Sequence, residues 1–154
     1  NLRGQDNPAL RSWMANQSRD LFERAEKLNP ANDSTIIGLG ATYIFGSSGQ
    51  APMDVMKGIQ KILEVTRRDS LNLYAQLMLG LGGIESGQYD KAIPRLLKVV
   101  NHDPANLEAI LSLGEAYERT GDQAAAKRWY TVAKKGTNNP DLVNAINERL
   151  ESLK

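Results

Sequence analysis

Few side chains in this sequence have the types and spacing that catalysis requires. His102 is the only histidine, and it falls in a turn at 101–104, where a solvated residue is expected rather than a general base. Glu115 and Glu118 share a helix face at a spacing of three residues, so they could act as an acid and base pair or bind a cation. No nucleophile or metal-ligand cluster accompanies them, so we interpret the pair as a solvated acidic rim.

The run Gly80-Leu81-Gly82-Gly83 has the composition of a phosphate-binding loop. It lies inside a predicted helix with no strand before it, so the structural context that such a loop needs is missing. The chain has no cysteine, which excludes a thiolate nucleophile and a disulfide framework. We therefore predict no catalytic residue, no metal site and no cofactor, and a protein that is not an enzyme.

Composition and charge limit the classes of partner. The chain has 154 residues, 41% of them hydrophobic, and a formal net charge of +1. This balance gives no global field that would favour nucleic acid or an anionic membrane. The apolar runs are shorter than the ~20 residues that a membrane helix needs, so we expect no membrane insertion by the residues present.

An internal repeat of 34 residues organises the rest of the sequence. A fixed period of this length indicates a stacked array of helical hairpins. Further copies of the opening or the close of the unit are found upstream, at 36–43, 58–65 and 18–30. The matched positions are Leu79-Gly80 with Leu113-Gly114, Gly87 with Gly121, Ala92 with Ala126, Leu96 with Tyr130, and Val99 with Ala133.

These residues resemble the tetratricopeptide repeat. Its pattern is a large apolar residue, Leu-Gly three residues on, an aromatic three after that, then Ala-x-x-x-aromatic and a closing proline. The copy at 107–139 fits best, with only the proline displaced to Pro140. The copy before it departs at two positions, with Gln76 in place of the large apolar residue and Gly83 in place of the aromatic.

The resemblance implies an all-α fold, a right-handed α-α superhelix of about three helix pairs with an N-terminal helix and a C-terminal capping helix. We predict one domain over 1–154: a half-repeat helix at 8–32, a repeat at 33–72 with a loop insertion at 46–52, repeats at 73–106 and 107–139, and a cap at 140–154. Asp33 or Ser34 is expected to cap the helix that follows the first turn. Gly87 and Gly121 are expected to end helices in the left-handed conformation.

In tetratricopeptide folds the first helix of each pair lines a concave groove. Carried over to this chain, the groove has an apolar floor that turns acidic toward its C-terminal end, which suits an apolar protein or peptide partner with basic residues. The alternative is that these side chains are core, packed under neighbouring helices. The implied groove residues are Ile37, Ala41, Ile44, Phe45, Tyr74, Leu77, Leu81, Ile84, Glu85, Glu108, Leu111, Glu115, Glu118 and Arg119.

The predicted function is a non-enzymatic protein-interaction scaffold. The alternative is a structural homo-oligomer whose groove is filled by its own helix or by a helix of a sister chain. The N-terminal helix has no preceding partner helix, so Trp13 and Met14 present an uncovered apolar surface. This surface could pack on the next repeat, on an upstream helix that is missing, or on another copy of the chain, which makes the two residues candidate oligomer contacts. The first residue is Asn rather than Met, so a signal peptide or anchor could precede it. The compartment is undetermined, with a slight preference for the bacterial periplasm or envelope over the cytoplasm.

Overall fold

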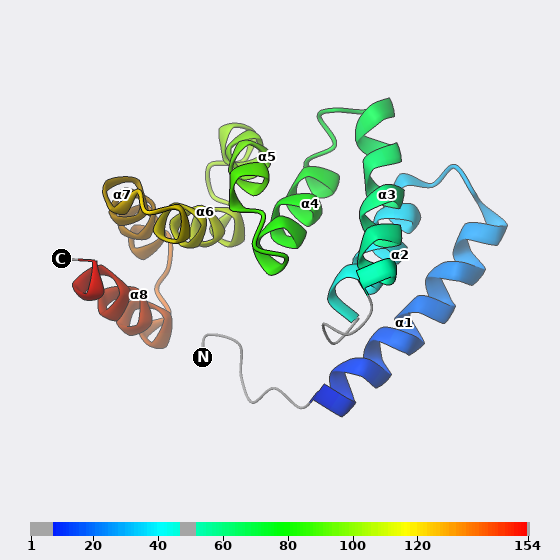
Figure 1. Ribbon diagram of the computed structural model, residues 1–154, viewed down its shortest axis with the longest axis horizontal. Helices are drawn as coiled ribbons and strands as arrows, with labels where there is room; N and C mark the ends of the chain where they lie inside the picture. The colour runs from blue at the N-terminus through cyan, green and yellow to red at the C-terminus, as the bar shows by residue number, and fades with distance from the viewer. Residues whose placement is uncertain (1–7, 47–51, 154) are drawn as a thin grey trace. The chain divides into compact units, whose positions relative to one another are not determined.

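The computed structural model describes residues 8–46 and 52–153, and within these ranges it consists of helices and turns without a strand (Figure 1). The prediction of an all-α fold is confirmed. The helices are α1 (Pro8–Leu28), α2 (Asp33–Gly46), α3 (Pro52–Arg68), α4 (Leu73–Glu85), α5 (Tyr89–His102), α6 (Leu107–Thr120), α7 (Gln123–Lys135) and α8 (Pro140–Ser152).

The chain divides into two compact units at Gly82 and Gly83, inside α4. The N-terminal unit contains α1, α2, α3 and most of α4, and the C-terminal unit contains the end of α4 and α5 to α8. The single-domain assignment over 1–154 stays a prediction. Most of the loop insertion predicted at 46–52, namely residues 47–51, lies outside the described residues.

Asparagine side chains begin three of the helices in the same way. The Oδ1 atoms of Asn32, Asn72 and Asn106 accept hydrogen bonds from the backbone N–H three residues later, at 3.0, 3.0 and 3.1 Å. Each bond satisfies a donor that the first helical turn leaves unpaired. The cap of α2 is therefore Asn32 and not Asp33 or Ser34, which both lie inside the helix. Asp33 instead pairs with Arg68 at the end of α3.

Both glycines predicted at helix ends have positive φ, 71° at Gly87 and 87° at Gly121. Gly121 is the left-handed C-cap of α6, and its N–H donates to the Glu118 carbonyl. This conformation is strained for residues with a Cβ atom, which explains why glycine recurs at this position of the repeat.

Small residues let the helices of the N-terminal unit approach closely. A Cβ atom added at Gly58 would lie 2.5 Å from the Gly40 carbonyl oxygen, so α2 and α3 cross almost backbone to backbone. On the other side of α2, the Phe22 ring of α1 packs against Gly38. The core beside this crossing comes from α2, α3 and α4, and its buried members are Ile36, Ile37, Ile44, Ile62, Val65, Ala75 and Leu79.

Small residues also let the helices of the C-terminal unit approach closely. A Cβ atom added at Gly114 of α6 would lie 2.7 Å from the Tyr130 ring of α7, which is itself buried. Ala126 of α7 is fully buried. Helix α8 packs on α7 and buries Ile146.

The two departures from the repeat pattern have local structural reasons. Gln76 is buried, and its amide Nε2 donates to the Ser70 carbonyl at 2.9 Å, so the side chain stabilises the turn between α3 and α4. A Cβ atom at Gly83 would lie 2.9 Å from the Cβ of Ala92. An aromatic residue at this position would not fit with α5 at its present distance.

Candidate partner-binding surfaces

Three of the predicted groove residues are core residues. Ile37 and Ile44 belong to the buried cluster of the N-terminal unit, where they pack with Ala75 and Leu79 of α4. Leu81 is also buried, with 7% of its surface exposed. The prediction that these three side chains meet a partner is wrong, because all three are buried. At Ile37 and Ile44 the reason is that α4 packs against α2.

The rest of the predicted apolar floor in the N-terminal unit remains accessible. Tyr74 of α4 is 46% exposed, and Leu77 is partly exposed one helical turn away. Ala41 and Phe45 of α2 are partly exposed and share a face at a spacing of four residues. We call these four residues the apolar surface of the N-terminal unit.

The C-terminal unit leaves its predicted groove residues exposed or partly exposed. Glu85, Glu108 and Arg119 are exposed. Ile84, Leu111 and Glu115 are partly exposed. This set combines apolar and acidic side chains, as the sequence suggested. Glu118 is also partly exposed, but it differs from the others because its carboxylate is engaged by neighbouring helices.

Glu118 connects three helices instead of lying on an open rim. Its Oε2 atom accepts a hydrogen bond from the Tyr130 hydroxyl of α7 at 2.8 Å, and its Oε1 atom accepts one from Arg149 Nη1 of α8 at 3.2 Å. Only 21% of its side chain is exposed. The interpretation of Glu118 as a solvated rim residue is wrong, because its carboxylate holds the capping helix to α6 and α7.

The Tyr130 hydroxyl carries a pH dependence of stability. Burial, followed by the hydrogen bond to Glu118 and the negative charge of that carboxylate, raises the pKa of Tyr130 above its usual value. The folded state then keeps this proton at a pH where the unfolded chain releases it. The stabilisation is therefore constant below about pH 10 and decreases as pH rises through the range above it.

We expect Tyr130→Phe to lower the free energy of unfolding by about 1 kcal/mol at neutral pH, because the hydrogen bond to Glu118 is lost. Above about pH 10 the difference between the two proteins should shrink, because only the wild type has the raised tyrosine pKa. Urea unfolding of both proteins at a series of pH values measures this difference. A difference that does not change with pH would show that the Tyr130 proton is not held by the fold.

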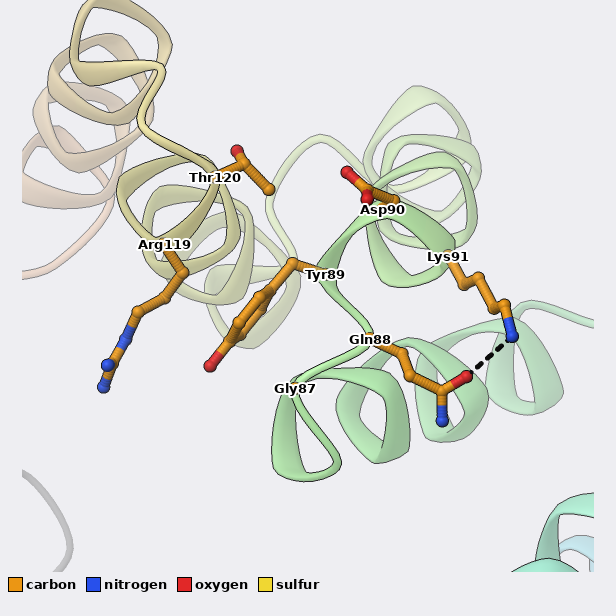
Figure 2. A pocket seen from close by; sticks show the side chains of 7 residues that line it. All are labelled: Gly87, Gln88, Tyr89, Asp90, Lys91, Arg119 and Thr120. Carbon is orange, nitrogen blue, oxygen red and sulfur yellow. Dashed lines mark hydrogen bonds between the residues drawn. The ribbon is translucent and has the colours of Figure 1, made fainter.

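Arg119 lies in a shallow cleft of about 440 Å³ at the C-terminal end of α6. Figure 2 shows its side chain beside the Tyr89 ring, with both side chains extending away from the ribbon in a similar direction. Across the cleft, Lys91 Nζ donates to Gln88 Oε1 at 2.8 Å. No sequence pattern selects Tyr89, because its position next to Arg119 depends on how the turn before α5 packs against α6.

A polar cluster joins α1, α2 and α3 in the N-terminal unit. The Tyr43 ring lies between Arg19, at 4.3 Å from the ring centroid, and Lys57, at 4.5 Å. The Tyr43 hydroxyl accepts from Lys57 Nζ at 3.0 Å and donates to Glu23 Oε1 at 3.1 Å. The hydrogen bond to Tyr43 is the main cause of a raised pKa at Lys57. A cleft of about 400 Å³ borders this cluster, and its mixed charges favour neither anions nor cations.

The candidate catalytic groups are not assembled into a site. His102 is exposed, with Nδ1 2.9 Å from the Lys98 carbonyl oxygen, and residues 80–83 are helical. In the described ranges, no three His, Asp or Glu side chains are grouped as a metal site would require. None of the described helices has the length and hydropathy to span a membrane.

Comparison with known proteins identifies the repeat. Residues 83–146 match a family model described as "Tetratricopeptide repeat". These residues are tetratricopeptide repeats. The match runs from the end of α4 to the middle of α8, and it includes the copy in which the sequence pattern is best kept. A search of curated proteins finds no match.

Solved structures extend the tetratricopeptide fold over most of the chain. A MamA mutant superposes with a TM-score of 0.71 at 21% identity, and the alignment covers 91% of this chain and 82% of that one. MamA MSR-1 gives 0.72 at 20% identity, with 91% and 78% covered, and MamA AMB-1 gives 0.70 at 22%, with 91% and 74% covered. At these identities the likeness establishes the fold. The resemblance to tetratricopeptide proteins is confirmed.

Proposed function

We propose that this chain is a non-enzymatic scaffold that binds a protein partner through the exposed faces of its first helices. In the N-terminal unit the contact is the apolar surface of Ala41, Phe45, Tyr74 and Leu77. The observation that carries the proposal is the exposure of Tyr74, a large aromatic side chain at 46%, among partly exposed apolar neighbours. Accessible apolar side chains on the first helices of such repeats are typical of sites that receive a helix or an extended peptide.

The acidic side chains of the C-terminal unit define the preferred partner. Glu85 and Glu108 are exposed and Glu115 is partly exposed, whereas Glu118 is engaged by Tyr130 and Arg149. Carboxylates next to Leu111 favour a ligand that alternates apolar residues with Lys or Arg. Charge complementarity of this kind contributes more to orientation and association rate than to affinity.

The test uses an amphipathic helical peptide with a leucine face flanked by lysines. We expect binding in fluorescence anisotropy, and a loss of at least tenfold in affinity for Tyr74→Ala/Leu77→Ser. The matched control is Val132→Ser, because Val132 is 43% exposed but lies on α7, a second helix. A peptide with lysines replaced by glutamates should bind more weakly to the wild type, and more so at low ionic strength.

Two results would reject the proposal. One is equal binding by the wild type and Tyr74→Ala/Leu77→Ser when circular dichroism shows that both proteins are folded. This result would show that the apolar surface does not contribute to binding. Equal binding of the lysine and glutamate peptides would remove the acidic component. Substitution of Leu81 is unsuitable for this test, because that side chain is buried and its loss would change stability.

A further inference from the structure

Helix α1 exposes four large apolar side chains along the side that does not face α2. Its inner side is occupied, since Phe22 packs on Gly38 and Arg19 Nη2 donates to the Thr42 carbonyl at 3.4 Å. The outer residues Leu10, Met14, Leu21 and Leu28 are 53%, 55%, 64% and 88% exposed. A row of four large apolar side chains along one helix of about 30 Å is unusual for a solvated face.

The stripe has the spacing of a coiled-coil seam. With Gln17 and Arg24, which are also exposed, the stripe positions recur at intervals of 4, 3, 4, 3 and 4 residues. This is the a/d spacing of the heptad repeat, in which two helices pack their side chains between one another. An ordinary amphipathic face has a wider stripe and does not keep this strict alternation. The six stripe positions are Leu10, Met14, Gln17, Leu21, Arg24 and Leu28.

The series is also symmetric about position 19, so it is complementary to itself in the antiparallel direction. Turning the helix end over end places Leu10 opposite Leu28 of a second copy, Met14 opposite Arg24, and Gln17 opposite Leu21. Every pair then joins an a position to a d position, as antiparallel helices require. The methylenes of Arg24 can cover Met14 while its guanidinium stays at the surface, where it already pairs with Asp20 at 2.7 Å.

Helix α8, the last helix of the chain, does not offer an equivalent partner. Four positions of α8 that lie one repeat period after Ile110, Leu113, Gly114 and Tyr117 of α6 are polar. Stacking α1 of one molecule on α8 of another would bury these amides and carboxylates without partners. A head-to-tail chain of molecules is therefore disfavoured, and a closed two-fold contact is favoured. The polar positions are Asn144, Asn147, Glu148 and Glu151.

The geometry points to an antiparallel, two-fold contact between α1 of this chain and α1 of a second copy. This contact does not use the surface proposed above for partner binding, so the two proposals succeed or fail separately. Gln17 and Arg24 make the seam partly polar, which fixes the register and weakens the pairing. The association is reversible, with dimers at high concentration and monomers on dilution.

Sedimentation equilibrium of the whole chain over a range of concentrations tests this contact. We expect the average mass to rise toward twice that of the monomer, and Leu21→Glu to abolish the rise. Because Leu21 is 64% exposed, the substitution should leave the circular dichroism spectrum and the thermal midpoint unchanged. The control Val132→Glu introduces the same charge at an exposed position of α7 and should dimerise like the wild type.

Cysteine cross-linking tests the register, and the absence of native cysteine leaves no background. A mixture of Leu10→Cys and Leu28→Cys chains should form a covalent dimer with a short thiol-reactive linker. Either variant alone should not, because in an antiparallel pair each of these positions lies almost a helix length from its own copy. Efficient cross-linking of either variant alone would overturn the antiparallel register.

Other outcomes would reject the contact itself. A wild type that stays monomeric at every concentration would show that α1 does not pair with its copy. Dimers that survive Leu21→Glu but disappear in Tyr74→Ala/Leu77→Ser would transfer the association to the apolar surface of the N-terminal unit. In that case α1 is not the interface.

Discussion

Gly58→Ala is expected to lower the free energy of unfolding of the chain by about 3 kcal/mol, the largest effect of any one-atom change proposed for it. The added Cβ would lie 2.5 Å from the Gly40 carbonyl oxygen and 2.9 Å from both Ile44 Cγ1 and Tyr43 Cβ. A backbone oxygen cannot rotate away as a side-chain end can. Helices α2 and α3 must therefore separate, which opens the core around Ile62. Thermal and urea unfolding measure the loss.

Gly82→Ala is the matched control, because it makes the same change inside another helix of the N-terminal unit. Its Cβ would lie 3.3 Å from Ile44 Cγ2, a contact that a side-chain methyl can relieve. Alanine also favours a helix over glycine by about 1 kcal/mol. The two effects nearly cancel, so Gly82→Ala should change stability little. Equal destabilisation by both variants would contradict the claim that the contact with the Gly40 carbonyl oxygen causes the loss of stability in Gly58→Ala.

Gly114→Leu and Ala126→Leu are expected to cost about 2–4 kcal/mol each in the C-terminal unit through overpacking. At Gly114 a Cβ would already lie 2.7 Å from Tyr130 Cε1, and leucine adds three further carbons at the same place. Tyr130 cannot move freely because its hydroxyl is bound to Glu118. Ala126 is fully buried, so leucine there must displace a neighbouring helix.

The control for this pair is Ala124→Leu, because Ala124 is exposed on α7 two residues from Ala126. Leucine is nearly as good a helix former as alanine, so the unfolding free energy should change by less than about 0.5 kcal/mol. Unchanged melting of Gly114→Leu would contradict the packing of α6 on α7. Double substitution of Gly114→Leu with Tyr130→Ala should recover part of the lost stability if the ring is the obstacle.

The fold class could be predicted from the sequence. The 34-residue period, the glycines at 87 and 121, and the alanines at 92 and 126 predict helical hairpins packed through small residues. The structure has positive φ at both glycines and complete burial at both alanines. Patterns of this kind are visible in a sequence because local conformation and close helix contact each restrict the residue type.

Which of the predicted surface residues are exposed could not be predicted from the sequence and depends on helix packing. A helix-face pattern places Ile37, Ile44 and Tyr74 on similar faces, but it cannot say whether the next helix covers that face. Stacking of α4 on α2 buries the two isoleucines and leaves the tyrosine exposed. Packing also distinguishes Glu118 from the other acidic side chains. Arg149 and Tyr130 reach Glu118 only because α7 and α8 fold back beside α6. Exposure and pairing are properties of neighbours distant in sequence, so they follow from packing and not from any local pattern.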